Sequence, residues 1–186
     1  MAAASSGRDG TGGKVRNIAA MTSAVALLAL PACKPVPPLK EYVYPAWNFA
    51  VSFRAPPRET DIPASADGKS NHGFVVESVL AGRDNLVNVI DGTGSTKSDD
   101  EVLSGTPKKL AGYVGGTLGP ITYAASGTAM GREFMISRPD HPVTRVRIFV
   151  ANKHLYEVIS QTALGFDDPE TVTFLDGFRL LKQPGS

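Results

Sequence analysis

The feature that most constrains the fold of this chain is a two-residue hydrophobic period that recurs in closely spaced segments. Phe134 alternates with Ile136 along one segment, and Val146, Ile148 and Val150 alternate along the next. This period places apolar side chains on one face of a β-strand and leaves the other face to polar residues. Closely spaced segments favour antiparallel hairpins, because parallel strands need a long crossover connection.

Seven segments carry strand patterns, and short turns connect several of them. Asn152-Lys153 is predicted to be a tight hairpin turn, since asparagine tolerates the left-handed backbone region. Gly82–Asn85 is predicted to connect an earlier hairpin, and the polar stretch Thr60–Gly73 to be a loop. The predicted strands are Asn48–Arg54, Phe74–Leu80, Leu86–Ile90, Leu118–Ser126, Thr128–Ser137, Thr144–Ala151 and His154–Gln161.

The first predicted helix lies within Ser95–Tyr113. Ser98 and Glu101 have the spacing of a capping box, which marks a helix N-terminus. Gly105 and Pro107 predict a short, irregular or split helix, because glycine lowers helix propensity and proline removes a hydrogen-bond donor.

The second predicted helix is Asp168–Leu181. Asp167 or Asp168 is its candidate N-cap, and Pro169 stands at the first helical position, where its missing N–H is tolerated. The order of strands and helices along the chain predicts an α+β fold. We expect an antiparallel sheet of about six to seven strands with helices packed on its faces.

The N-terminal region has the build of an export signal. Lys14 and Arg16 precede Ile18–Leu30, thirteen residues without a charge, and this run is too short for a membrane span of about 20 residues. We therefore expect residues 1–32 to be a signal peptide. Residues 1–13 are unlike the basic start of such a signal, which favours a true translation start further along, for example at Val15.

The sequence Leu30-Pro31-Ala32-Cys33 resembles the bacterial lipobox, and it contains the only cysteine of the chain. The resemblance implies a lipoprotein that is cleaved before Cys33, lipidated on its thiol and acylated at the new amino terminus, for example with palmitate. Two or more acyl chains anchor a protein stably. Lys34 is not the aspartate that retains enterobacterial lipoproteins at the inner membrane, which favours the outer membrane. The alternative is a short buried helix with an incidental cysteine.

Residues 33–45 are predicted to be a semi-rigid tether, because Lys34–Pro45 holds four prolines. A peptide-recognition segment is the alternative interpretation. Residues 46–182 are then predicted to form the globular α+β domain.

The whole chain has a net charge of +1 and residues 1–32 contribute +2, so the remainder carries −1. Such a balanced surface gives no reason to expect nucleic acid as a partner.

The C-terminal half is similar to a widespread group of uncharacterised bacterial proteins. The matching residues are Gly131–Phe134, Leu155, Tyr156, Val158, Phe174, Leu175, Phe178 and Leu180, and Gly177 stands where a serine is common. That group resembles the Mog-type and PsbP-like fold, and the resemblance covers about Asn48–Leu181. These motifs consist of core and turn residues, so they carry fold rather than chemistry. Relatives of the fold are mainly non-enzymatic accessory or binding proteins.

Three arginines are the candidate binding residues of the domain. Arg132, Arg145 and Arg147 lie on strands predicted to be neighbours, where together they would offer a basic patch to an anionic partner or lipid headgroups. The alternative is that Glu133 and Glu157 pair with them across strands. No catalytic residue, metal ligand or cofactor site is assigned, and the glycine-rich residues 91–96 fit a turn better than a phosphate loop.

These patterns predict a lipid-anchored protein of the cell envelope, on the periplasmic side. We expect a non-enzymatic accessory or binding protein that contacts membrane lipid through Cys33 and an envelope protein or small ligand through its domain. The alternative is an envelope hydrolase or a small-ligand carrier with a cleft near Asp140 and His141, since adjacent carboxylate and imidazole groups can exchange protons.

Overall fold

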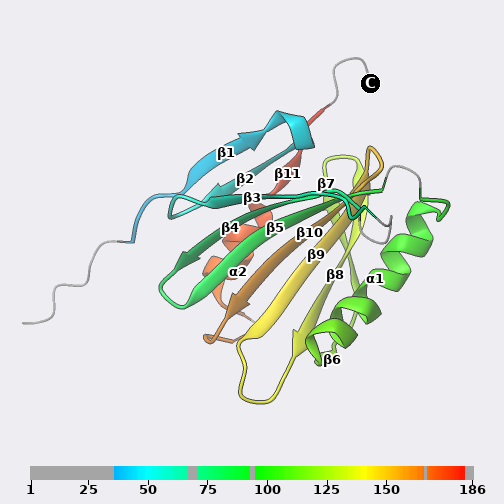
Figure 1. Cartoon of the computed structure of the whole chain (residues 1–186). Helices are drawn as coiled ribbons and strands as arrows, with labels where there is room; N and C mark the ends of the chain where they lie inside the picture. Colours follow the sequence, from blue (N-terminus) through cyan, green and yellow to red (C-terminus); the bar gives the residue numbers. More distant parts are fainter. Residues whose placement is uncertain (1–35, 67–70, 93–94, 166, 183–186) are drawn as a thin grey trace, which may run out of the picture. The chain divides into compact units, whose positions relative to one another are not determined.

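Backbone hydrogen bonds build two antiparallel sheets in the part of the chain that the structure describes. The computed structural model describes residues 36–66, 71–92, 95–165 and 167–182. The large, eight-stranded sheet has the spatial order β3-β4-β5-β10-β9-β8-β6, and β7 also pairs with β8 (Figure 1). Its strands are β3 (Arg58–Ile62), β4 (Gly73–Leu80), β5 (Arg83–Asp91), β6 (Thr117–Leu118), β7 (Thr122–Ser126), β8 (Ala129–Ser137), β9 (Val143–Ala151) and β10 (His154–Thr162).

A three-stranded sheet and two helices complete the fold. The small sheet is formed by β1 (Lys40–Tyr44), β2 (Phe49–Phe53) and β11 (Arg179–Leu180), with β2 in the centre. A single 3-10 turn, Pro45–Trp47, connects β1 to β2. The helices are α1 (Asp99–Val114) and α2 (Pro169–Asp176). The expected antiparallel sheet with helices is therefore present. The large sheet has eight strands instead of six to seven, and strand residues far outnumber helical residues among those described.

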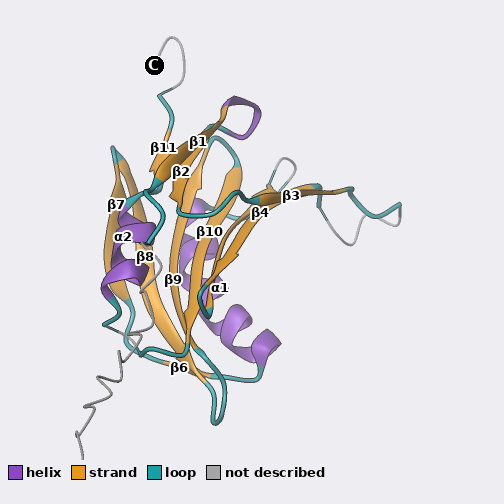
Figure 2. Ribbon diagram, turned by 90° about the vertical axis from the view of Figure 1, so that its left-hand side faces the viewer, coloured by secondary structure: helices purple, strands orange, loops and turns teal. Residues whose placement is uncertain are grey.

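The large sheet separates two apolar cores, because successive side chains of a strand point to opposite faces. On one face, the small sheet and α2 pack over Val87, Val89, Phe149, Tyr156 and Val158. Aromatic rings dominate this core, with Phe178 stacked between Phe49 and Phe149. On the other face, α1 packs over Phe134, Ile136, Val146 and Ile148. Figure 2 shows α1 and α2 on opposite sides of the large sheet.

The N-terminal boundary of the domain differs from the sequence prediction. Lys40–Tyr44, predicted to be part of the tether, is strand β1 and pairs in register with β2. The prolines of the segment flank this strand and do not interrupt it, and Tyr44 is buried in the core. The predicted signal peptide and Cys33 lie outside the described residues.

Helix α1 is continuous, although a short or split helix was predicted. Both halves of its capping box are present, with Ser98 Oγ accepting from the Glu101 amide and the Glu101 carboxylate accepting from the Ser98 amide. Pro107 lies inside the helix and is buried. Packing on the sheet outweighs the lost hydrogen bond, because most helical stability in proteins comes from the buried face. The helix ends at Val114 and is capped by Gly115, whose φ of 66° suits glycine.

Helix α2 is shorter than predicted, and its expected last residues form a strand. Pro169 is the first helical residue, as expected, but the helix ends at Asp176. Arg179 and Leu180 then pair with β2 as strand β11. Pairing with β2 satisfies the backbone groups of these residues, which a longer helix would satisfy internally. Phe178 therefore lies between α2 and β11 and packs into the core from there.

Two further boundaries differ for local reasons. The predicted loop Thr60–Gly73 contributes to β3, which pairs with β4 through exposed, mostly polar residues that carry no alternation. The predicted strand Leu118–Ser126 is split into β6 and β7 around Pro120, which cannot donate to a ladder. The Asn152-Lys153 hairpin is confirmed, with φ of 53° and 63° at its two turn residues.

Candidate functional site

Helix α1 covers only part of its face of the large sheet, and this leaves a groove beside the helix. The helix packs mainly on β6, β8 and β9, above the apolar residues of the second core. The part of the same face on β4 and β5 carries Glu77, Asp84 and Asn88, which are half-buried. An apolar helix over these groups would remove them from water at a large free-energy penalty. At the edge of α1, Val102 and Leu110 line one cavity together with Leu155 on β10.

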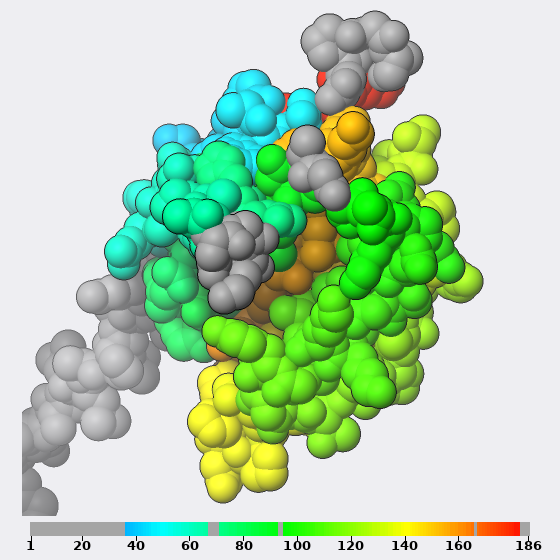
Figure 3. All heavy atoms as spheres, turned by 45° about the vertical axis from the view of Figure 1, so that its right-hand side comes forward, coloured from blue at the N-terminus to red at the C-terminus, as the bar shows by residue number. Residues whose placement is uncertain are grey.

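The groove contains a cavity of about 330 Å³ between α1 and the strands β5 and β10. Ile90 and Leu155 line it from the sheet, and Val102, Thr106 and Leu110 line it from the helix. A second cavity, of about 240 Å³, adjoins it and shares Ile90, Val102 and Leu155. Figure 3 shows the hollow, with β10 in orange-brown at its floor and α1 in green along one side.

Glu157 lines the larger cavity from β10 and is the most unusual group in it. Only 5% of this residue is exposed. Its Oε2 accepts a hydrogen bond of 2.7 Å from the Asn88 amide on β5. Burial raises the pKa of Glu157, and the Asn88 hydrogen bond opposes this only in part. A buried carboxyl group with one neutral partner can take a further donor from a bound molecule.

Exposed polar side chains surround the mouth of the cavity. Lys97 and Lys109 line it from the α1 side, and both are exposed. Tyr113 also lines the cavity and is 91% exposed, so its ring is not part of the packed core. Glu101 is occupied by the capping box at the start of α1. The groove thus combines apolar walls, a buried carboxyl group at its floor and positive charge at its rim.

The three arginines of the predicted basic patch do not come together. Arg145 and Arg147 lie on the α2 side of the large sheet and share the carboxylate of Glu133, at N–O distances of 2.5 Å. Arg147 also contacts Asp176 at 2.7 Å. Burial tends to raise the pKa of Glu133, but the hydrogen bonds from Arg147 and Arg145 outweigh it and leave the pKa lowered.

Arg132 lies on the opposite face of the sheet, because its position on β8 differs by an odd number of residues from Glu133. Its Nη2 is 3.2 Å from the Asp100 carboxylate, and its guanidinium stacks 4.5 Å from the centre of the Tyr123 ring. The alternative prediction of cross-strand ion pairs therefore holds for Glu133, which pairs with Arg145 and Arg147. Glu157 makes no such pair, since it faces the α1 side and bonds Asn88 instead.

Asp140 and His141 border a shallow depression of about 380 Å³ together with Val143 and Thr162. Both are exposed residues of the turn between β8 and β9, and Asp140 has a φ of 59°. Asparagine and aspartate tolerate this left-handed region in turns. Among the hydrogen bonds of the described residues, none joins the two side chains. The arrangement fits a turn-forming role.

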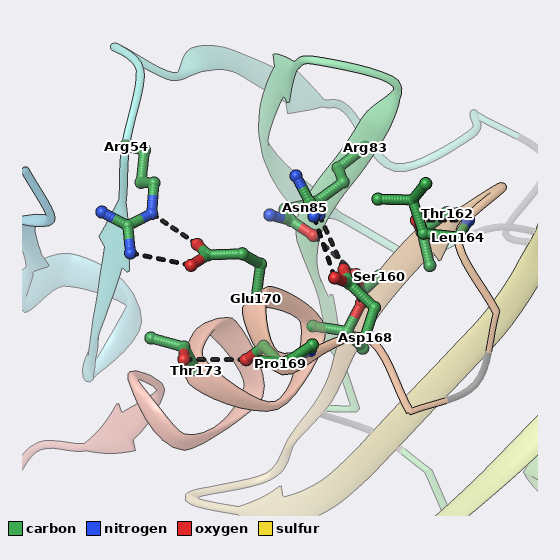
Figure 4. Close-up of polar contacts among 11 residues, drawn as sticks. Arg54, Arg83, Asn85, Ser160, Thr162, Leu164, Asp168, Pro169, Glu170 and Thr173 are labelled. Carbon is green, nitrogen blue, oxygen red and sulfur yellow. Dashed lines mark hydrogen bonds and ion pairs between the residues drawn. The ribbon is translucent and has the colours of Figure 1, made fainter. Parts of the chain in front are cut away.

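A polar network lies where the end of the large sheet meets the start of α2 (Figure 4). Arg83 donates hydrogen bonds of 2.7 and 2.9 Å to the Asp168 carboxylate, and Thr171 Oγ1 donates a third of 3.2 Å. These hydrogen bonds lower the pKa of Asp168, and the bond from Arg83 has the largest effect. Ser160 is fully buried and donates to the Asn85 side chain at 2.7 Å. Since these groups satisfy one another, the network attaches α2 to the sheet.

Metal and membrane features were also sought in the described residues. Within residues 36–66, 71–92, 95–165 and 167–182, no three His, Cys, Asp or Glu side chains gather as a metal-binding group. In the same ranges, neither helix has the length and apolar character needed to cross a bilayer.

Sequence reasoning missed the groove, although one signal for it was present. Along β10, Leu155, Glu157 and Ile159 share one face, so an acid stands between two apolar residues on the side that faces α1. An acid at such a position is either paired or functional. The sequence alone predicts Glu157 only as an ion-pair partner of arginines on neighbouring strands.

The comparisons with known proteins define the fold class of this domain. The solution structure of cyanobacterial PsbP (CyanoP) from Synechocystis sp. PCC 6803 is similar, with a TM-score of 0.54 and 11% sequence identity. The match covers 83% of this chain and 98% of that chain. The described domain therefore has a PsbP-like fold. No family model matches the chain, and no curated protein matches it.

Proposed function

We propose that this chain is a lipid-anchored binding protein of the cell envelope, whose groove beside α1 takes up a small ligand. The anchor is acylated Cys33, and the domain lies on the periplasmic side, with the outer membrane favoured over the inner. The protein is a non-enzymatic accessory or binding component. We also propose that its layers correspond to an α+β sandwich of the PsbP-like type.

The observation that supports the groove most strongly is the buried carboxyl group of Glu157 in a cavity of about 330 Å³. Ligand sites are typically concave and mostly apolar, of about 300 Å³ or more, with few polar groups that fix orientation. A carboxyl group buried without a charged partner destabilises a fold, which favours a functional reason for its presence.

The depression at Asp140 and His141 is the weaker candidate for a carrier or hydrolase site. Its volume is similar, but its polar groups are exposed residues of a turn. Exposed groups gain little from contact with a ligand, because water already solvates them. The groove is preferred because its carboxyl group is desolvated before any ligand arrives.

Two glycines of α1 provide the test. Gly105 lines the cavity, whereas Gly112 does not, and a Cβ atom added at either position meets nothing within 4 Å. Gly105→Leu should therefore fill the groove, and Gly112→Leu should leave it open. Both changes should raise helix stability to a similar extent, by up to about 1 kcal/mol, so they form a matched pair.

The full chain is purified from envelopes in a mild detergent and weighed by native mass spectrometry. We expect wild type and Gly112→Leu to carry the same small-molecule mass, and Gly105→Leu to lose at least about nine-tenths of it, a loss of about 1.4 kcal/mol in binding. Retention of that mass by Gly105→Leu, or its absence from all three proteins, would contradict the proposal.

A further inference from the structure

We propose that the ligand of the groove carries a primary ammonium group attached to an apolar segment, with the Glu157 carboxylate as its counter-charge. This inference rests on the proposed function and names the chemical class of the ligand. It is carried by the depth of Glu157, the single neutral partner of its carboxylate and the apolar residues beside it.

The carboxylate selects an ammonium group over other polar groups. Asn88 donates to Oε2, and no cation pairs with Glu157 among the described residues. An ammonium group supplies both the missing charge and further N–H donors. An alcohol can also donate to the carboxylate, but it leaves the buried negative charge uncompensated, so it should bind more weakly than an ammonium group. A carboxylate ligand would meet a like charge at the floor.

The apolar walls of the cavity determine where the apolar part of the ligand would lie. Ile90 and Leu155 on the sheet and Val102 and Leu110 on the helix line the same cavity as Glu157. Burial of methylene groups against such walls is favourable, because it removes apolar surface from water. A short alkyl chain that follows the ammonium group would therefore add affinity without further polar contacts.

Lys97 and Lys109 raise the competing interpretation of an anionic ligand. Both are exposed, and exposed charges are screened by water and salt, so each contributes little. Glu157 lies in a low-dielectric position, where the same unit charge acts more strongly. The charge at the floor therefore decides the sign of the buried end of the ligand, and the two lysines act only on its outer end.

Three probes of equal length test this class: n-hexylamine, n-hexanol and n-hexanoate. Each is titrated into the full chain in detergent and followed by NMR, with a titration of the detergent alone subtracted. We expect n-hexylamine to bind at least about tenfold more tightly than n-hexanol, equivalent to about 1.4 kcal/mol, and n-hexanoate to bind most weakly.

Glu157→Gln should remove the preference for the amine while n-hexanol still binds. Glu77→Gln is the control, because Glu77 lies on the same sheet but does not line the cavity, and it should preserve the preference. Equal binding of the three probes, tighter binding of n-hexanoate, no binding of any probe, or a preference that survives Glu157→Gln would overturn the inference. The proposed function is judged separately, by the mass that Gly105→Leu retains.

Discussion

At the scale of single residues, Glu157 is expected to make the domain less stable at neutral pH than an uncharged residue would. Burial raises its folded pKa above the unfolded value of about 4.3. As pH rises from the unfolded toward the folded pKa, the unfolded chain ionises while the folded protein stays protonated, so stability falls. Above the folded pKa the loss is complete.

Glu157→Gln should therefore stabilise the domain near pH 7, because it removes the free-energy cost of ionising a buried carboxyl group whose pKa is raised. The gain should vanish below the unfolded pKa, where both states of the wild type are protonated. The remaining groups around the cavity, Lys97, Glu101, Lys109 and Asn88, are the same in both proteins. Urea unfolding of the two proteins between pH 4 and pH 8 measures this difference. An equal or larger gain at pH 4 would contradict it.

At the scale of elements, the hydrophobic period predicted the strands whose two faces meet different environments. Strands β8, β9 and β10 fall within one or two residues of their predicted bounds, since each has one face under α1 and the other toward α2. The glycine at position 131, part of the matching motif, is also explained by packing. A Cβ atom there would lie 2.6 Å from the Phe149 ring, so the strand needs a residue without one.

The elements that sequence reasoning missed depend on contacts between distant parts of the chain. Strand β11 forms because Arg179 and Leu180 meet β2, which lies about 130 residues earlier in the sequence. Helix α2 is fixed in the same way, because Arg54, which directly follows β2, binds Glu170 in its first turn, and Arg83 on β5 binds its N-cap residue Asp168. Local helix propensity does not reflect either of these long-range contacts, so the sequence predicts a longer helix.

The candidate site was harder to predict than the fold, for a similar reason. Neighbouring strands predict a common patch for the three arginines, but the two-residue period separates Arg132 from Arg145 and Arg147. The groove depends on how far α1 extends over the sheet, which the amphipathic pattern of the helix does not specify. The acid at position 157 was visible, but its partner Asn88 lies 69 residues away.

At the scale of the whole molecule, we propose that acylated Cys33 attaches the PsbP-like domain to a membrane. Cys33→Ala should release the full chain from membranes, because acylation supplies the membrane affinity and the domain carries no strong positive charge. Fractionation after a high-salt wash measures this, with wild type retained in the membrane pellet and the variant in the supernatant. A variant that stays in the pellet would contradict the anchor.

The groove beside α1 is proposed as the place where this protein binds its ligand. The most direct measurement is an amide NMR spectrum of the full chain, titrated with a small-molecule extract of envelopes. We expect the amide shifts to change first at four residues that line one cavity, Ile90, Gly105, Leu155 and Glu157. Changes confined to Asp140–Val143, at the depression on the β8–β9 turn, or no changes at all, would contradict it.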